Sequence, residues 1–335
     1  MAENTFFHEI HQELDAKLVP CGKWKLPLFY PGGAIAEHRN CREKAALFDL
    51  TGTEIFQTAG KDAGKALSKI FADPCADLPV GGVMRSFMLR ENGNFAAFFT
   101  LCRMQQDDFM LHLDRNTPEK DKSYLLDKIK SAGLEVRDLS SAMAILTLAG
   151  PDAARILQEA GAEVLPEKEH WQMSAVTDED GDTFRCIVVA RERFGETAFD
   201  LCVNADNAVE FYGAIYRING VCPAGIAAWE SLHLESGVPQ VPGELHSGVS
   251  PERSADLVIL EAPRHAALPG TVVKAQGGIP VGVITSGAYC PAAGKARMFC
   301  RIEPSVAGEE LRGLSVLING KETAVELANA EISLK

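Results

Sequence analysis

The chain has 335 residues, of which 46% are hydrophobic and 24% are charged. This length exceeds what one hydrophobic core usually organises, so we expect two or three domains, and the mixture of apolar and charged residues excludes disordered and collagen-like chains. The formal net charge is -13, which opposes binding to phosphate backbones and anionic lipid. We therefore expect neither a nucleic acid nor a membrane as partner, and an anionic small ligand would need a locally positive pocket.

The nine cysteines are dispersed along the chain, and none forms a Cys-x-x-Cys pair. The ligand spacing of a zinc ribbon is thus missing, and an odd, scattered set is typical of a reducing compartment. Residues 1–15 contain no basic segment followed by an apolar one, so no secretory signal is predicted. The longest apolar stretches, such as 142–150, reach about half of a membrane span. We expect a cytoplasmic protein.

Two segments resemble each other, at 54–72 and 143–162. In each, an apolar run leads to a glycine, an Asp-Ala pair and apolar residues at helical spacing. Each segment therefore predicts a strand, a turn and a helix, with Asp62 and Asp152 in the position of the helix N-cap.

The residues after each copy are also alike. The first copy is followed by predicted strands and one helix, at 83–89, 95–104, 109–113 and 119–133. The second copy is followed by a similar series, at 184–190, 198–203 and 207–218. Repeats of β-α-β-β-α-β type are typical of split β-α-β domains. We predict an α+β fold with two such ferredoxin-like lobes, although periodicity leaves a doubly wound sheet open.

The composition changes after residue 267. Short β-rich runs are separated there by Gly, Pro and Asn, without any helix-length pattern. This arrangement predicts a small antiparallel barrel or sandwich. Between 223 and 266 lies a proline-rich connector with one predicted helix, at 227–236.

Generic catalytic motifs are missing from the sequence, including the P-loop, the dinucleotide fingerprint, HExxH and GxSxG. His8 and His11 have the i, i+3 spacing that could meet one metal ion. Because no cysteine or further histidine accompanies them in a recognised metal-binding spacing, we interpret them as two solvated residues of an N-terminal helix and predict no metal site.

Four segments together resemble the glycine cleavage system T-protein family, at 37–52, 191–201, 229–257 and 282–291. They contain the Glu-His pair that leads to a Phe-Asp strand, the Phe-Gly-Glu turn, the Leu-Glu-Ser-Gly stretch and the Thr-Ser-Gly sequence, in the family's order. The resemblance implies a three-lobed, cloverleaf-like body with a C-terminal β-barrel and tetrahydrofolate in a central funnel.

The resemblance also implies domain boundaries. Residues 1–48 together with 139–226 would form the first folate-binding lobe, and 49–138 the second lobe. Residues 227–267 would be a connector that completes the funnel, and 268–335 would form the barrel.

The implied activity is the transfer of one-carbon units to or from tetrahydrofolate. An aminomethyltransferase would receive its substrate on a lipoyl carrier protein. The alternatives are a demethylase, which is a methyltransferase that uses a small-molecule one-carbon donor, and a folate-binding paralogue without catalysis.

The resemblance assigns several residues to the pterin. A carboxylate can accept two hydrogen bonds from the donor edge of that ring, and Glu196 matches the family position that does so. Asp114 falls where the family has an Asn near the pterin, with His112 beside it. Trp229 could stack on the ring or belong to the core.

Other positions depart from the family. Its catalytic aspartates are replaced by Ala97 and Phe98, which cannot accept a proton or stabilise a cation, so the catalytic residues stay unassigned. The basic residues of its helix at 227–236 are replaced by Trp229 and His233. We expect that a basic group near the barrel could bind the carboxylates of folate, and its members are Arg253, Arg264, Lys274, Lys295 and Arg297.

Overall fold

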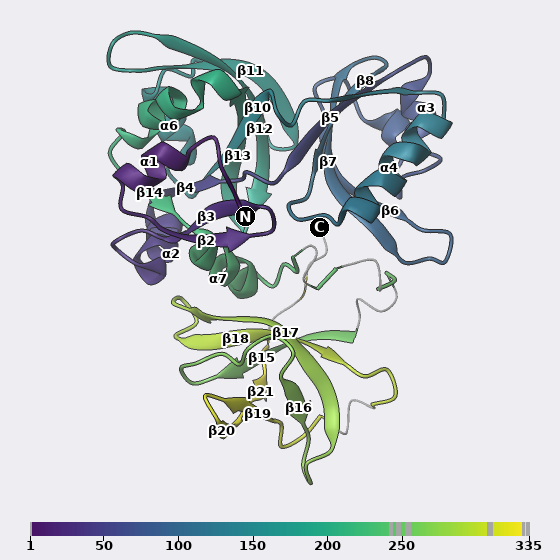
Figure 1. The fold of residues 1–335 in the computed structure, drawn as a ribbon, viewed down its shortest axis with the longest axis vertical. Coiled ribbons are helices and arrows are strands. Elements are labelled where there is room, and N and C mark those ends of the chain that lie inside the picture. Colours follow the sequence, from purple (N-terminus) through teal and green to yellow (C-terminus); the bar gives the residue numbers. More distant parts are fainter. Residues whose placement is uncertain are drawn as a thin grey trace.

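The structure is a computed structural model that describes residues 2–240, 244–245, 249–251, 256–306, 311–329 and 332. Figure 1 shows three parts: two α/β lobes side by side and a β-rich domain beneath them. The predicted α+β fold with a three-lobed, cloverleaf-like arrangement is confirmed. None of the helices in the described ranges is long and apolar enough to cross a membrane.

The first lobe is built on a sheet of six strands. Their order is β11 (His170–Thr177), β12 (Thr183–Arg193), β13 (Glu196–Asn204), β10 (Met143–Ala149), β4 (Ala45–Asp49) and β14 (Val221–Ala224). Its helices are α1 (His8–Glu13), α2 (Ala34–Glu43), α5 (Ala153–Glu159) and α6 (Ala208–Tyr216). A small sheet beside it has the order β1 (Glu3–Asn4), β3 (Trp24–Phe29) and β2 (Lys17–Cys21).

The second lobe has a five-stranded sheet. The strand order is β6 (Val83–Leu89), β7 (Phe95–Gln105), β8 (Asp108–Leu113), β5 (Glu54–Ala59) and β9 (Glu135–Asp138). Its helices are α3 (Ala63–Leu67) and α4 (Glu119–Ser131), with a 3-10 turn at Cys75–Asp77. The order β7-β8-β5-β9 is that of a split β-α-β domain, which confirms the predicted ferredoxin-like lobe.

The first lobe has the same strand order, except that one strand comes from a different part of the chain. Strands β12, β13 and β10 correspond to β7, β8 and β5, but β4 from the N-terminal region pairs with β10 where the second lobe has β9. Strand β14 then adds parallel to β4. The N-terminal region is therefore part of the same sheet as the second repeat.

Two details differ from the sequence prediction. Asp62 and Asp152 precede α3 and α5, but neither side chain accepts a capping hydrogen bond. Arg155 instead binds the Asp152 carboxylate at 2.9 Å, and Lys65 binds that of Asp62 at 2.9 Å. Strand β11 was not predicted, because only one of its residues is buried and its apolar alternation is weak.

The C-terminal domain is a nearly closed antiparallel barrel whose sheet has seven strands. Their order is β20 (Lys321–Ala324), β19 (Ser315–Ile318), β16 (Val272–Lys274), β17 (Pro280–Cys290), β18 (Lys295–Ile302), β15 (Leu257–Ala262) and β21 (Glu326–Leu327). Strand β15 begins before residue 268, so the connector supplies one strand of the barrel sheet.

Helix α7 (Ile226–Ser236) joins the three parts. On one side, Trp229 and Leu232 belong to a hydrophobic cluster that also contains residues of both α/β lobes. On the other side, Leu234 packs against Ile259 and Phe299 of the barrel. Figure 1 shows this helix between the first lobe and the β-rich domain, and its buried side chains also contact the second lobe.

Candidate functional site

A pocket opens between the two α/β sheets and α7, with a volume of about 810 Å³ when its open mouth is included. Most of its polar side chains come from the ends of strands β6, β8, β12 and β13, and three come from α7. Such a junction between domains is where small-molecule sites commonly form.

The start of α7 is fixed by close backbone contacts. Gly225 precedes the helix, and a Cβ atom at this position would collide with the carbonyl oxygen of Leu28. Its N–H donates to the buried carboxylate of Glu37 over 3.0 Å, and the same carboxylate accepts the N–H of Tyr30 over 2.6 Å. These contacts tie α7 to the small sheet and to α2.

Trp229 projects from α7 into the centre of this junction. Its ring packs against Phe48 and Phe194, with centroid distances of 5.2 and 4.8 Å. The guanidinium carbons of Arg115 and Arg193 lie 5.0 and 5.1 Å from the ring centre. Trp229 is thus both a core residue and a wall of the pocket, and cations already occupy two positions around its ring.

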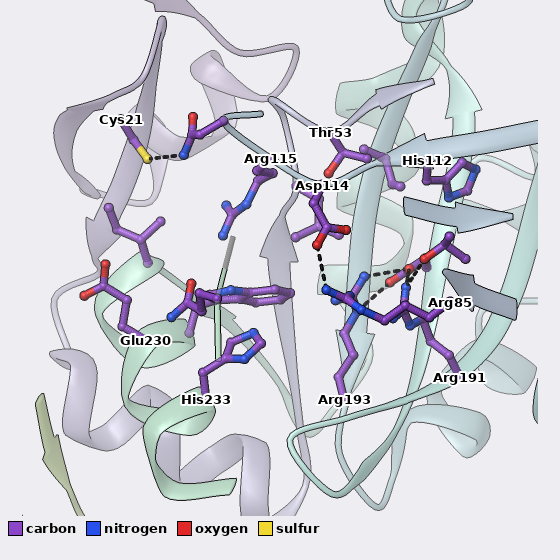
Figure 2. Close-up of a pocket in the computed structure, with 18 of the residues that line it drawn as sticks. Cys21, Thr53, Arg85, His112, Asp114, Arg115, Arg191, Arg193, Glu230 and His233 are labelled. Atoms are coloured by element: carbon purple, nitrogen blue, oxygen red, sulfur yellow. Dashed lines mark hydrogen bonds and ion pairs between the residues drawn. The ribbon is translucent and has the colours of Figure 1, made fainter. Parts of the chain in front are cut away.

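Asp114 follows the last residue of β8, and its carboxylate points toward Arg85 (Figure 2). Oδ2 accepts a hydrogen bond from Arg85 Nη2 over 2.7 Å, and the Asp114 N–H donates to the carbonyl of Phe98. Among the residues that the structure describes, Oδ1 has no hydrogen-bond partner. This oxygen can accept a donor from a ligand.

A buried ionic cluster forms the opposite wall. Asp200 accepts from Arg193 Nε and Nη2 over 3.0 and 2.7 Å, and from Thr147 over 2.5 Å. Arg191 lies 3.4 Å from the same carboxylate and donates to Thr100 over 2.6 Å. Burial alone would raise the pKa of Asp200, but the two arginines hold it well below its usual range. Burial and Arg193 lower the pKa of Arg191 to about 10, so it stays charged at neutral pH.

Two histidines of the pocket are neutral near pH 7. Burial lowers the pKa of His112 to about 4, and the nearby guanidinium groups of Arg191 and Arg193 act in the same direction. Burial and Arg193 also lower the pKa of His233 well below its usual range. Each imidazole can then donate one hydrogen bond and accept another.

Comparison with known proteins identifies the family. Residues 7–257 match the model of the GCVT N-terminal domain family. The chain belongs to this family. The predicted resemblance of this chain to the glycine cleavage system T-protein family is thereby confirmed.

Several curated relatives of this GCVT chain are aminomethyltransferases, which are transferase enzymes. The protein of Stenotrophomonas maltophilia is 26% identical over 363 residues, which covers 98% of this chain and 95% of the relative. That of Symbiobacterium thermophilum is 29% identical over 257 residues, which covers 74% of this chain and 68% of the relative.

The fold of this GCVT chain also matches a solved structure. Glycine cleavage system aminomethyltransferase T from Bartonella henselae superimposes with a TM-score of 0.84 at 22% identity. The match covers 98% of this chain and 97% of the other, so the two proteins share their fold from end to end.

Three of the four residues expected at the pterin come together in this pocket of the GCVT chain. His112, Asp114 and Trp229 all line it, from two different parts of the molecule. His112 is 3% exposed, and its Nδ1 atom has no hydrogen-bond partner in the described part of the chain.

Glu196 lies elsewhere. It is the first residue of β13 and lines a neighbouring hollow together with Lys168 and Phe199. Its Oε1 binds Arg42 Nη1 over 2.8 Å, and Arg42 also binds Glu235 over 2.9 Å. Its expected contact with pterin stays a prediction, and it would require Arg42 to release the carboxylate.

Neither position of the family aspartates carries a polar group into the pocket. Ala97 lies in the core of the second lobe. Phe98 packs with Phe95 and with Leu245 of the connector, and the Arg85 guanidinium lies 6.0 Å from its ring. An apolar ring therefore stands beside the Arg85–Asp114 pair, where a carboxylate was expected from the family.

Two of the five basic residues expected near the barrel are held in ion pairs, and the binding of folate carboxylates by this group stays a prediction. Lys295 and Arg297 both bind Glu261, over 2.9 and 3.0 Å, while Arg264 and Lys274 are exposed on the barrel domain. Arg253 lies outside the described residues. The positive groups of the pocket are instead four arginines that the sequence analysis did not single out: Arg85, Arg115, Arg191 and Arg193. The i, i+2 spacing of Arg191 and Arg193 on one strand was the available signal.

The interpretation of His11 as a solvated residue is wrong. Its side chain is fully buried, with Nε2 at 3.0 Å from Asp49 Oδ2 and Nδ1 at 2.8 Å from the hydroxyl of Tyr30. Helix α1 packs its inner face into the first lobe, which periodicity over six residues was too short to show. His8 is half-buried, and no group of metal ligands occurs in the ranges that the structure describes.

Proposed function

We propose that this chain is a tetrahydrofolate-dependent one-carbon transferase, and that aminomethyl transfer is its reaction. The supporting observation is the pocket itself: in a GCVT chain, it is lined both by the aromatic ring of Trp229 and by Asp114, whose Oδ1 has no partner among the described residues. Tetrahydrofolate, when bound, supplies a nucleophilic ring nitrogen that accepts the one-carbon unit.

The chemistry of the pocket fits a reduced pterin. That ring presents N–H donors on one edge, and the free oxygen of Asp114 is suited to accept one of them. Glu230 offers a second carboxylate at the pocket wall. The Arg85 guanidinium keeps the Asp114 carboxylate in place over 2.7 Å, which fixes the direction of the acceptor.

The residues of this pocket would act mainly by positioning. Because Ala97 and Phe98 supply no carboxylate, no described group at these positions can take a proton or stabilise a developing cation. Holding two reactants in line can by itself supply several kcal/mol toward a transfer reaction, on the order of 7–11 in well-oriented systems.

The replaced aspartates favour a second candidate function. A demethylase that transfers a methyl group from a small-molecule donor has less need for a carboxylate near the folate nitrogens. Its apolar donor side would be compatible with Phe98 beside Arg85. The replacement of the aspartates is also compatible with a third function, a protein that binds folate but catalyses no transfer.

We propose correspondingly that the partner is a lipoyl carrier protein for the first function or a small-molecule one-carbon donor for the second. We also retain the cytoplasm as the expected compartment, on the basis of the odd and dispersed set of cysteines.

Two measurements test the proposal. A calorimetric titration with tetrahydrofolate should show saturable binding. The absence of binding would contradict all three folate-dependent functions. Incubation with tetrahydrofolate and an aminomethyl-loaded lipoyl carrier should yield methylenetetrahydrofolate. Binding without this product in the presence of active carrier would exclude aminomethyl transfer and leave the demethylase or the binder.

Substitution of Asp114 tests which carboxylate accepts the pterin. We expect Asp114→Asn to weaken tetrahydrofolate binding by about 1.5 kcal/mol, the scale of a charged hydrogen bond. Asp127→Asn is the matched control, because Asp127 is exposed on α4. Glu196→Gln should have a smaller effect, since Arg42 holds that carboxylate. A larger effect for Glu196→Gln than for Asp114→Asn would restore Glu196 as the pterin ligand.

A further inference from the structure

We propose that Arg115 forms a carboxylate-binding subsite in the central pocket, separate from the acceptor at Asp114. The inference rests on the proposed function only in assuming that ligands enter this pocket. The carboxylate could belong to the one-carbon donor or to the glutamate tail of folate, and the experiment below distinguishes these two sources.

The first observation is that Arg115 has no ionic partner within the described part of the chain. Its guanidinium makes one long hydrogen bond, from Nη1 to the carbonyl oxygen of Asp49 over 3.4 Å. No carboxylate oxygen of the described residues forms an ion pair with it. A desolvated charge without a partner is costly, and proteins usually pair such groups. A ligand carboxylate would complete this pairing.

The second observation is the surplus of positive charge around Arg115. Arg191 and Arg193 share the single carboxylate of Asp200, and Arg85 is paired with Asp114. Glu230 is the third carboxylate of the pocket and is near enough to favour the charged form of Arg115, but the two form no ion pair among the described residues. In the acidic surface of a chain with net charge -13, this group is a local positive site. Small anions would therefore be attracted to the pocket.

The third observation is that two guanidinium groups already surround Trp229. Arg115 and Arg193 lie at 5.0 and 5.1 Å from its ring centre. A cationic ligand would meet their repulsion instead of a free aromatic face. The pocket thus selects against a quaternary ammonium or sulfonium group and in favour of an acid.

The fourth observation concerns an unsatisfied buried atom of the same pocket. Among the residues that the structure describes, Nδ1 of His112 has no hydrogen-bond partner, although His112 is 3% exposed. Buried polar atoms almost always have partners, and this one has almost no accessible surface, so a ligand oxygen would reach it only if the ring turned toward the pocket. In the tautomer protonated at Nδ1, His112 would donate to an anionic or carbonyl oxygen.

Binding calorimetry with three small probes tests the subsite in the full-length protein. Benzoate carries a carboxylate on a planar ring, benzamide is its neutral analogue, and tetramethylammonium is a compact cation. We expect wild-type protein to bind benzoate at least ten times more tightly than benzamide, and tetramethylammonium not to bind. Equal binding of benzoate and benzamide would overturn the proposal without any variant.

Variants of Arg115 assign the preference to this residue. We expect Arg115→Gln to abolish the preference for benzoate and Arg115→Lys to retain part of it, because lysine keeps the charge but not the planar donor pair. Arg39→Gln is the matched control, since Arg39 is exposed on α2 and outside the pocket. A full preference for benzoate in Arg115→Gln would also overturn the proposal.

The two sources of the carboxylate are separated by comparing tetrahydrofolate with 6-methyltetrahydropterin, which lacks the glutamate tail. If the tail binds at Arg115, Arg115→Gln weakens tetrahydrofolate binding at least tenfold and leaves the tetrahydropterin unchanged. If the donor carboxylate binds there, both pterins bind Arg115→Gln as they bind the wild type, while benzoate does not. Failure of one-carbon transfer in the wild type would contradict the proposed function but leave these binding results in place.

Discussion

Arg193 and Asp200 form a bidentate ion pair beneath the central pocket, with Nε–Oδ1 and Nη2–Oδ2 distances of 3.0 and 2.7 Å. They lie on adjacent strands of one hairpin, and the Asp200 side chain is 1% exposed. The pair connects the sheet of the first lobe to Trp229, because the same guanidinium approaches the indole ring. The shape of the pocket wall therefore depends on a buried charge.

Removing that charge should destabilise the fold. We expect Asp200→Asn to lower the free energy of unfolding by about 3 kcal/mol, because Arg191 and Arg193 would lose their shared carboxylate in a buried site. Urea denaturation followed by circular dichroism measures this change. Asp206→Asn, at an exposed position, is the control and should stay within about 0.5 kcal/mol of the wild type. A similar small change for Asp200→Asn would show that water solvates the two arginines.

Protonation of His112 should make stability fall in mild acid. Its pKa is lowered from 6.5 to about 4 by burial, so between these values the unfolded chain binds a proton that the folded protein does not. Stability attributable to this residue is complete above pH 6.5 and decreases as pH falls toward 4, by about 3 kcal/mol in total.

The variant His112→Gln isolates this contribution. We expect its free energy of unfolding to decline less steeply than that of the wild type between pH 6.5 and 4, as measured by urea denaturation at a series of pH values. His170→Gln, at an exposed position of β11, is the matched control. Parallel curves for wild type and His112→Gln would contradict the neutral, buried state of His112.

Gly225, the residue before α7, lies too close to the backbone of Leu28 for any side chain to fit. We expect Gly225→Ala to lower stability by about 2 kcal/mol, since the new methyl group would collide with the Leu28 carbonyl and displace the helix that carries Trp229. Gly213→Ala in α6 is the control, because nothing lies within 4 Å of a Cβ atom there. This second change should stabilise the protein, by up to about 1 kcal/mol. Thermal unfolding should show a lower midpoint temperature for Gly225→Ala and a higher one for Gly213→Ala than for the wild type.

Much of the local structure could be predicted from the sequence. The strands expected at 83–89 and 109–113 correspond to β6 and β8, and the helix expected at 227–236 corresponds to α7. These elements have an apolar alternation or a helical spacing that is complete within one segment. The expectation that Asp114 and Trp229 belong to the site came from the resemblance to the family, and both line the central pocket.

The remaining features depend on contacts between distant segments. Strand β4 completes the sheet of the second repeat from the N-terminal region, and a local pattern carries no information on that pairing. Glu196 looked free in its turn, but Arg42 from a distant helix holds its carboxylate. His11 looked solvated for the same reason, because its partner Asp49 is distant in the chain.

Periodicity in the sequence by itself predicted the repeated strand-turn-helix units and the β-rich C-terminal domain, while the choice of an α+β fold over a doubly wound sheet and the expected replacement of the family's aspartates by Ala97 and Phe98 rested on the resemblance to the family. Only the tertiary structure decided which charges share the pocket: it gathers Arg85, Arg115, Arg191 and Arg193 from three segments and leaves Arg115 without an ion pair in the described residues. The physical reason is that electrostatic pairing depends on distances in space, which are set when the sheets and α7 pack together.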